Sequence, residues 1–458
     1  MTKVQTEIDS LLKTVKSIHM IGIGGSGMCP LAEILHSWGY SLTGSDNNET
    51  DTLARIRKMG IPVTLGHSPD NIADAEMVVY SAAIMRDNPE LSEAFRRSVP
   101  TFERSVLLGA VSRRYENSIC ISGTHGKTTV TSMLAQIMIE AAADPAVVIG
   151  GKLPLIDANG RAGNSDTLIC EACEFNDTFL ELSPAVSVLL NIDDDHLEYF
   201  KTMDNLVNSF SIFASNAKKA VICNGDDPLV MKSVSGLSNI ITFGLSDSND
   251  YYAENIRVLP GVKCEFELMY KKELLGTLRL NVPGRHNVLN ALAASAAAFY
   301  AGMNFRQIES GLAHFTGAGR RFEILGRPDG ITVADDYAHH PTELRAVLSA
   351  AMEMGFNKVW AVFQPFTFSR TVMLMDDFVT ALKIPDRVVL SEIMGSREIN
   401  TYGVHASDLG KKIDRAVWFE TFNEIADYIF SNAKTGDLVI TLGCGDIYKA
   451  AKLILEKY

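Results

Sequence analysis

The sequence lacks the long apolar runs that a membrane-spanning helix requires. No window of the 458-residue chain reaches the roughly 18 apolar residues that indicate a transmembrane helix. Its start, MTKVQTEIDSLLKTVKSIHM, interleaves charges with apolar residues and lacks the continuous apolar core of a signal peptide. We therefore expect a cytoplasmic protein that has no membrane partner.

Clustered positive charge and a cysteine framework are missing as well. The net charge is −13 and no basic cluster of five or more occurs, so we expect no nucleic acid partner. Seven cysteines, an odd number scattered through apolar segments, exclude a regular disulfide framework and indicate reduced thiols. The pair Cys170-x-x-Cys173 has no second pair beside it, which argues against a zinc site.

What the chain does have is an alternating α/β pattern. Apolar runs of strand length alternate with helix-length segments, which predicts an α/β fold with mainly parallel sheets. Between Leu245 and Val282 the alternation changes to period two, which predicts antiparallel hairpins attached to a middle domain. The length exceeds what one core supports, and pattern breaks predict three domains, 1–107, 108–317 and 318–458. The predicted parallel strands include Ser17–Ile23, Ala75–Ser81, Asn117–Ile121, Ala185–Ile192, Lys358–Phe363, Arg387–Glu392 and Asp437–Gly443.

A first glycine-rich loop, Ile21–Met28, follows a predicted strand and precedes a helix predicted over Leu31–Trp38. Glycines let the backbone approach a phosphate, and the helix N-terminus supplies free N–H groups. Asp46 ends the next strand about 20 residues later, where a Rossmann fold places an acidic residue against a ribose. The glycines run G-x-G-G-x-G rather than G-x-G-x-x-G, so the loop alone leaves a dinucleotide site and a plain tight turn open.

A second glycine-rich loop, Gly123–Thr129, lies between a predicted strand, Ser118–Ile121, and a predicted helix, Val130–Ala141. Its backbone amides would cradle phosphates, Lys127 would neutralise the β- and γ-oxygens, and the Thr128 hydroxyl would bind magnesium. The loop is a shortened variant, because the usual spacing needs glycine at position 121, which is isoleucine. Two phosphate loops in separate domains make a dehydrogenase a poor explanation.

Acidic residues follow two further predicted strands. CEACE ends one strand with Glu171, and NIDDDH ends another with Asp193–Asp195 and His196. The carboxyl ends of parallel strands are the edge at which open α/β sheets bind ligands. Magnesium prefers carboxylate and phosphate oxygens, so Glu171 is predicted as a ligand and His196 as a less typical one. For the three aspartates a solvated loop is an equal alternative.

Eight segments follow one another in a specific order along the chain. They are GIGGSGM at 22–28, YSAAI at 80–84, GTHGKTT at 123–129, CEACE at 170–174, NIDDDH at 191–196, GRHNVLNA at 284–291, GRRFE at 319–323 and DDYAHHPTE at 335–343. In this order they resemble the Mur ligase family, and the resemblance covers nearly the whole chain. The resemblance implies an N-terminal Rossmann-like domain for a UDP-sugar, a central ATPase-like domain with a small antiparallel β extension, and a C-terminal Rossmann-like domain.

The resemblance also implies a reaction, in the alanine-adding branch of the family. ATP is expected to phosphorylate the lactyl carboxylate of UDP-N-acetylmuramate, and L-alanine to attack the acyl phosphate, giving ADP and phosphate in peptidoglycan precursor synthesis. Mg²⁺, with Mn²⁺ as the alternative, is the implied metal, and the implied assembly is a monomer or homodimer. A ligase that returns recycled tripeptide to the same sugar and a nucleotide-sensing module without catalysis stay open.

Carried over position by position, the resemblance assigns a role to each matching residue. The implied catalytic residues are Lys127, His196 and Arg321. The implied ATP-binding residues are Gly123, Thr124, His125, Gly126, Lys127, Thr128, Thr129, Asn287, Asn290, Arg321 and Asp336. The implied UDP-sugar residues are Gly24, Gly25, Ser26, Gly27, Asp46 and Ser81. The implied metal ligands are Thr128, Glu171 and His196. His339, His340 and Arg370 are placed for the amino acid or the γ-phosphate, with a loop or domain contact as an equal alternative.

The chain departs from the family pattern at a few positions. Phe366 follows Gln-Pro where the family commonly has histidine, Ala82 replaces a serine, and Cys173 stands where an acidic residue is common. The stretch Asn208–Ile212 contains no lysine, so we expect no carbamylated lysine bridging two metals.

Overall fold

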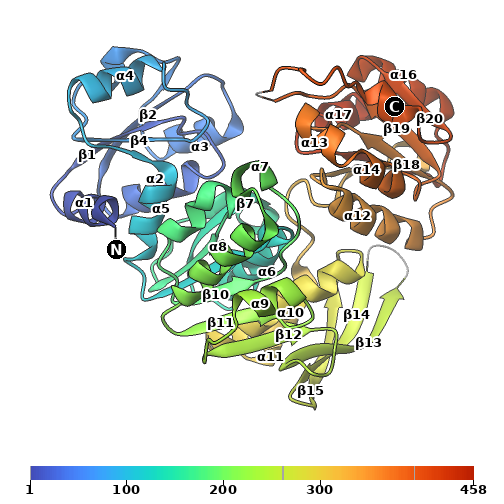
Figure 1. Ribbon diagram of the computed structural model, residues 1–458, viewed down its shortest axis with the longest axis horizontal. Coiled ribbons are helices and arrows are strands. Elements are labelled where there is room, and N and C mark those ends of the chain that lie inside the picture. Colours follow the sequence, from blue (N-terminus) through green and yellow to red (C-terminus); the bar gives the residue numbers. More distant parts are fainter. Residues whose placement is uncertain (1, 260–262, 397) are drawn as a thin grey trace. The chain divides into compact units, whose positions relative to one another are not determined.

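The computed structural model describes residues 2–259, 263–396 and 398–458 (Figure 1). The chain forms two compact units. The first comprises Met1–Glu254, Glu267–Gly276 and Leu289–His314, and the second comprises Asn255–Phe266, Thr277–Val288 and Phe315–Tyr458. No helix among the described residues is long and apolar enough to cross a membrane.

The first unit begins with a five-stranded parallel sheet in the order β3-β2-β1-β4-β5. The strand order reverses between β1 and β4, which makes a switch point at the carboxyl ends of these two strands. The first glycine loop leaves β1 at this point. The elements are α1 (Lys3–Leu11), β1 (Ser17–Ile21), α2 (Cys29–Ser37), β2 (Ser41–Asp46), α3 (Asp51–Lys58), β3 (Val63–Leu65), η1 (Pro69–Ile72), β4 (Met77–Tyr80), α4 (Pro89–Arg96) and β5 (Thr101–Glu103).

A ten-stranded sheet follows, in the order β15-β14-β13-β12-β11-β10-β6-β9-β7-β8. β6 pairs in parallel with both β9 and β10, so the loops after these three strands emerge at one edge. The elements are α5 (Arg104–Ser112), β6 (Asn117–Ser122), α6 (Lys127–Glu140), β7 (Ala146–Leu153), η2 (Pro154–Ile156), β8 (Ala158–Arg161), β9 (Thr167–Glu171), η3 (Phe175–Glu181), β10 (Val186–Leu189), α7 (Leu197–Phe200), α8 (Met203–Ser215), β11 (Ala220–Asn224), α9 (Pro228–Ser233), β12 (Ile240–Gly244), β13 (Tyr251–Leu259), β14 (Lys263–Tyr270), β15 (Glu273–Leu280), α10 (Arg285–Tyr300) and α11 (Phe305–His314).

The period-two segment forms strands, as predicted. β14 and β15 are neighbours in the sheet and only Lys271 and Lys272 separate them. A link of two residues suffices for an antiparallel hairpin, whereas parallel neighbours need a crossover of a dozen residues or more. The two-residue link therefore indicates that β14 and β15 form a hairpin.

Within the first unit, one apolar core runs through the five-stranded sheet and the part of the ten-stranded sheet that belongs to this unit. It includes Met20 and Leu31 of the first sheet and its helix, Leu107 of α5, and Cys170 and Phe210 of the second sheet layer. The predicted domain boundary after residue 107 falls inside α5. The three-domain division stays a prediction.

The second unit contains a six-stranded sheet in the order β16-β17-β21-β18-β19-β20, parallel except for β16. Alternate residues of β18 enter two different cores, with Phe363 on one face and Trp360 on the other. Helices therefore cover both faces, as in a doubly wound α/β fold. The elements are β16 (Glu323–Gly326), η4 (Pro328–Gly330), β17 (Thr332–Asp336), α12 (Pro341–Glu353), β18 (Val359–Phe363), α13 (Phe368–Met373), α14 (Met375–Leu382), β19 (Arg387–Ser391), α15 (Ala406–Gly410), β20 (Ala416–Phe419), α16 (Phe422–Asn432), β21 (Leu438–Leu442) and α17 (Tyr448–Glu456).

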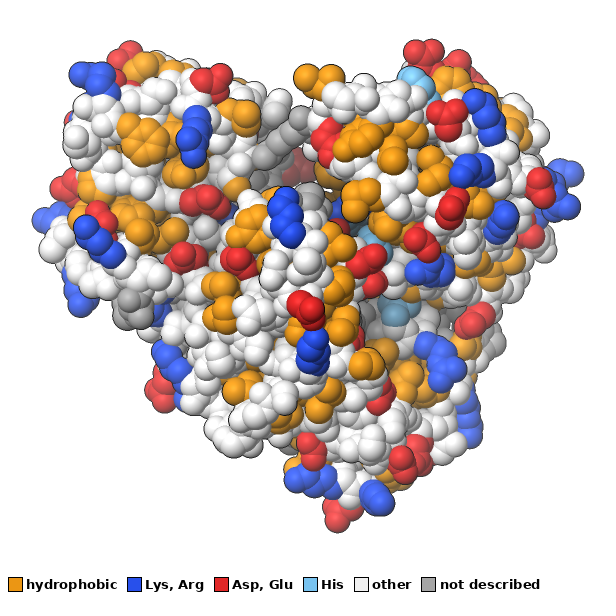
Figure 2. Space-filling view, viewed as in Figure 1, with side chains coloured by type: hydrophobic (Ala, Val, Ile, Leu, Met, Phe, Trp, Pro, Cys, Tyr) orange, Lys and Arg blue, Asp and Glu red, His pale blue; other side chains and the backbone are white. Residues whose placement is uncertain are grey.

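The α/β class and the mainly parallel sheets predicted from the sequence are thus confirmed. Charged side chains of both signs are scattered over the face drawn in Figure 2, with apolar side chains between them. The net charge of −13 is therefore not gathered into one acidic area on that face.

Candidate active site

The second glycine loop joins β6 to α6 at the carboxyl edge of the large sheet. Gly126 has a φ of +87°, and a Cβ there would lie 2.7 Å from Oδ1 of Asn290. Both facts require glycine at this position. α6 begins at Lys127, three residues before the predicted start, so Thr128 and Thr129 belong to its first turn. The free N–H groups of that turn make an anion site.

The ammonium of Lys127 lies folded back over the loop. Nζ donates to the carbonyl of Thr124 at 3.1 Å, to the carbonyl of Gly123, and to both carboxylate oxygens of Glu174 at 2.9 and 3.1 Å. Burial alone would lower the pKa of Lys127, but the neighbouring negative charges, led by Glu174, raise it above its ordinary value. The lysine therefore stays a cation. Sequence reasoning assigned no role to Glu174, although it belongs to the CEACE segment.

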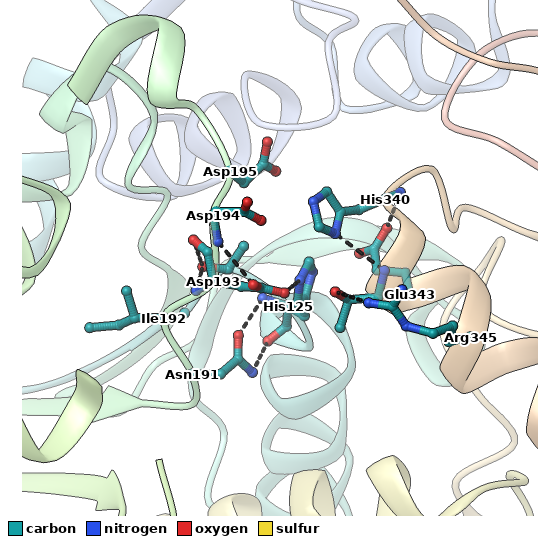
Figure 3. A network of polar contacts seen from close by, with 12 residues as sticks. His125, Asn191, Ile192, Asp193, Asp194, Asp195, His340, Glu343 and Arg345 are labelled. Carbon is teal, nitrogen blue, oxygen red and sulfur yellow. Dashed lines mark hydrogen bonds and ion pairs between the residues drawn. The ribbon is translucent and has the colours of Figure 1, made fainter. Parts of the chain in front are cut away.

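The loop after β10 is hydrogen-bonded to the second glycine loop (Figure 3). The side chain of Asn191 accepts from the N–H of His125 at 2.8 Å and donates to the carbonyl of His125 at 3.0 Å. The Oδ2 atom of Asp193 accepts a hydrogen bond from Nε2 of His125 at 3.1 Å. The backbone N–H of Asp193 donates to the Thr124 hydroxyl at 2.9 Å. The aspartate loop is therefore a structural partner of the phosphate loop. It also carries His196, whose ring lies 4.7 Å from that of Phe175.

Glu171 ends β9, beside the start of the phosphate loop. Its Oε1 accepts from the N–H of Gly150 at 2.6 Å, which fixes the carboxylate at the sheet edge. The Thr128 hydroxyl and the Glu171 carboxylate are oxygen donors of the kind that Mg²⁺ prefers. A metal site can be sought as three His, Cys, Asp or Glu side chains whose ligand atoms all lie within 4.8 Å of one another. Among the described residues, no such group contains Glu171 together with His196. The joint metal site stays a prediction.

A cavity of about 340 Å³ brings the first glycine loop to the edge of the large sheet. Its lining includes Gly25–Met28 of that loop, Ser81 after β4, and Glu171. Arg104, at the start of α5, adds a positive charge, and a Cβ on Gly27 would lie 3.0 Å from its Nη1. Sequence reasoning did not find Arg104, because no glycine or charge motif surrounds it.

Asp46 stabilises the first glycine loop directly. Its Oδ2 accepts from the N–H of Gly24 at 3.0 Å and its Oδ1 from the N–H of Asn47 at 2.8 Å. A Cβ at position 24 would lie 2.9 Å from that Oδ2, so the close approach requires glycine. The predicted contact of Asp46 with a ribose is untested.

The remaining predicted residues of the second unit have local partners there. Asp336 is 3% exposed, and its oxygens accept from the N–H groups of Phe322 and Ala338, both at 2.7 Å. Burial raises the pKa of Asp336 to about 6, against the lowering effect of Arg321. Arg321 also stacks over Tyr337, with its Cζ 5.1 Å from the ring centre.

Both predicted histidines of this unit belong to the start of α12. His340 caps the helix by accepting from the N–H of Thr342 at 3.3 Å, and Nδ1 of His339 lies 3.0 Å from the Tyr337 carbonyl. Arg370 lies in α13, and Asn287 in α10 donates to the carbonyl of Pro283 at 2.7 Å. These contacts are local, and the substrate roles of the four residues stay predictions.

Three family models match the chain in order. They are the Mur ligase family catalytic domain at residues 17–116, the Mur ligase middle domain at residues 121–298, and the Mur ligase glutamate ligase domain at residues 320–445.

Individual relatives match almost the full length. The chain is 41% identical over 449 residues to a UDP-N-acetylmuramate–L-alanine ligase of Acetivibrio thermocellus, covering 96% of each chain. It is 42% identical over 449 residues to the enzyme of the same name from Clostridium botulinum strain Langeland, covering 96% of this chain and 98% of that one. Among solved structures, the UDP-N-acetylmuramate-alanine ligase MurC of Thermotoga maritima matches with a TM-score of 0.82 and 30% identity over 96% of this chain and 99% of that one.

Proposed function

Because the chain belongs to the Mur ligase family, we propose that it joins L-alanine to the lactyl carboxylate of UDP-N-acetylmuramate and converts ATP to ADP and phosphate in the same reaction. One structural observation carries the proposal. The cavity lies between the first glycine loop and Glu171, which ends the strand next to β6 and its second glycine loop, and this supports a phosphorylated sugar in the cavity and a nucleoside triphosphate at that loop. Near-full-length relatives that bear this enzyme name support the choice of substrates.

The chemistry requires two successive substitutions. A lactyl carboxylate oxygen attacks the γ-phosphorus of ATP, the bond to the β–γ bridging oxygen breaks, and ADP leaves. The nitrogen of alanine then attacks the carbonyl carbon of the acyl phosphate. Collapse of the tetrahedral intermediate breaks the bond from carbon to the phosphate oxygen, phosphate departs, and the nitrogen loses a proton to form the amide. Activation is needed because a free carboxylate has no leaving group.

The residues of the first unit supply positioning and positive charge. The loop 123–129 and the N-terminus of α6 hold the triphosphate, with Lys127 toward the β- and γ-oxygens. Gly24–Gly27, Asp46 and Ser81 hold the UDP-sugar, and Arg104 faces its anionic groups in the cavity. Such preorganised charge lowers the barrier of phosphoryl transfer without a covalent enzyme intermediate.

A divalent cation fits the oxygen donors at this edge. Thr128 and Glu171 would hold Mg²⁺ together with phosphate oxygens, and His196 would complete the set. When bound, the cation neutralises charge on the transferring phosphoryl group.

The proposal extends to the last part of the chain. Arg321 and Asp336 would serve the nucleotide from a C-terminal domain beginning near residue 318, and Asn287 and Asn290 from the start of α10. His339, His340 and Arg370 are proposed for the amino acid or the γ-phosphate.

The test is phosphate release from ATP by the purified protein with magnesium and UDP-N-acetylmuramate. Release that requires both the sugar and L-alanine is the expected result. Release with the tripeptide but not with alanine would assign the chain to the tripeptide-adding branch. Nucleotide binding without any release would leave a sensing module, and parallel reactions with glycine and serine measure selectivity.

A further inference from the structure

Glu174 is a buried carboxylate that the reaction scheme above does not use. Its side chain is 2% exposed, and it lies in the connection between β9 and η3, three residues after Glu171. Both of its oxygens accept from Nζ of Lys127, at 2.9 and 3.1 Å. This pair ties the loop after β9 to the phosphate loop after β6.

The ammonium of Lys127 has three N–H donors and four acceptors in the structure. The other two acceptors are the carbonyls of Gly123 and Thr124, which belong to the phosphate loop itself. A triphosphate entering the loop needs donors from the same ammonium, so some of these contacts must be exchanged.

The energetic costs decide which contacts are exchanged. Leaving a neutral carbonyl without a partner costs less free energy than removing the partner of a buried charge. Phosphate oxygens therefore replace the carbonyls of Gly123 and Thr124, whereas Glu174 keeps its contact with Lys127.

We propose that Glu174 is a positioning residue of the ligase reaction, which holds the end of Lys127 at a fixed distance from the phosphate loop. The proposal rests on the proposed function. A lysine side chain has four flexible carbons, and it stabilises developing charge efficiently only when its ammonium is fixed beforehand. The reach of the Glu174 side chain supplies that restraint.

Two variants separate reach from charge. In Glu174→Gln the amide oxygen can still accept from Nζ with the same side-chain reach, but the second acceptor and the negative charge are gone. In Glu174→Asp the charge remains, but the side chain is one carbon shorter. Glu33→Asp is the control, because Glu33 is also buried, at 8% exposed, and pairs at 2.7 Å with Arg55, whose own side chain is 36% exposed.

The measurement is kcat and KM for ATP and for UDP-N-acetylmuramate in the full-length enzyme. We expect Glu174→Asp to lower kcat at least about tenfold, Glu174→Gln to lower kcat less than Glu174→Asp because it loses the charge but keeps the reach, and both to leave KM for the sugar unchanged. Glu33→Asp should match wild type. A purely structural role would instead lower thermal stability without the difference between the two Glu174 variants.

The proposal is wrong if Glu174→Asp is as active as Glu174→Gln, or if both equal wild type. Should Glu174→Asp fail to fold, Glu174→Ala provides the shortened side chain, and activity equal to that of Glu174→Gln again refutes the restraint. Wild-type enzyme that releases no phosphate would refute the proposed function itself, independently of the comparison among variants.

Discussion

The side chain of Asn191 is hydrogen-bonded to both backbone polar groups of His125: it accepts from the N–H at 2.8 Å and donates to the carbonyl at 3.0 Å. A residue on the loop after β10 thereby sets the path of the phosphate loop after β6. Each of these two hydrogen bonds contributes about 1 kcal/mol of net stability. Together they fix a loop whose glycine residues allow many backbone conformations.

Asn191→Ala should weaken ATP binding about tenfold, because the unrestrained loop must be ordered again when the nucleotide binds. Titration of ATP followed by calorimetry measures the change. Equal affinities in the variant and wild type would contradict the role of this contact.

Lys127→Ala should abolish turnover while the fold survives. The expected loss of kcat is at least about a hundredfold, since a preorganised charge facing the transferred phosphoryl group is removed. Phosphate release measures the loss, and circular dichroism checks the fold. Near-normal rates in a folded variant would remove Lys127 from the catalytic residues.

Gly126→Ala should impair the nucleotide site, because the new Cβ would lie 2.7 Å from Asn290 Oδ1 at a φ of +87°. Gly60→Ala is the matched control. Gly60 has a φ of +85° and nothing within 4 Å of its Cβ position, so it carries the same backbone strain of about 1 kcal/mol without the clash. We expect Gly126→Ala to lower the melting temperature at least as much as Gly60→Ala, and we expect a loss of ATP affinity only in Gly126→Ala. Equal ATP affinities would show that the contact with Asn290 does not matter.

Glu90 should make the free energy of unfolding depend on pH in the acidic range. The carboxylate is fully buried, and burial raises its pKa, but hydrogen bonds from His19, Ser45 and Asn71 outweigh burial and lower the pKa from 4.5 to about 2. A lowered folded-state pKa stabilises the protein above the ordinary pKa, and this contribution disappears as pH falls from about 4.5 toward 2.

Glu90→Gln should therefore be less stable than wild type at pH 7, on the order of 2 kcal/mol, and the difference should shrink below pH 4. Urea unfolding at several pH values measures it. Glu93→Gln, in the same helix α4, should change stability less, because Glu93 pairs with Arg96, whose side chain is 72% exposed. A difference for Glu90→Gln that does not vary with pH would exclude the charge as its cause.

Local patterns in the sequence determined the secondary structure and the order of the loops. The strands at Ser17, Asn117 and Arg387 begin at the predicted residues, because apolar runs of strand length, each followed by glycine or polar residues, specify buried parallel strands. The two-residue link at Lys271 and Lys272 follows from the period-two pattern around it. The family could also be recognised, since its motifs occur in a fixed order along the chain.

Only the tertiary structure decided which side chains of separate loops meet. Glu174 contacts Lys127 across 47 positions, Asn191 contacts His125 across 66, and Arg104 shares a cavity with Gly27 and Glu171. The order of segments along the chain predicts which loop follows which strand, but not which loops lie side by side. Strand order then brings the loops after β6, β9 and β10 together, because non-consecutive strands pair as neighbours and align their carboxyl ends.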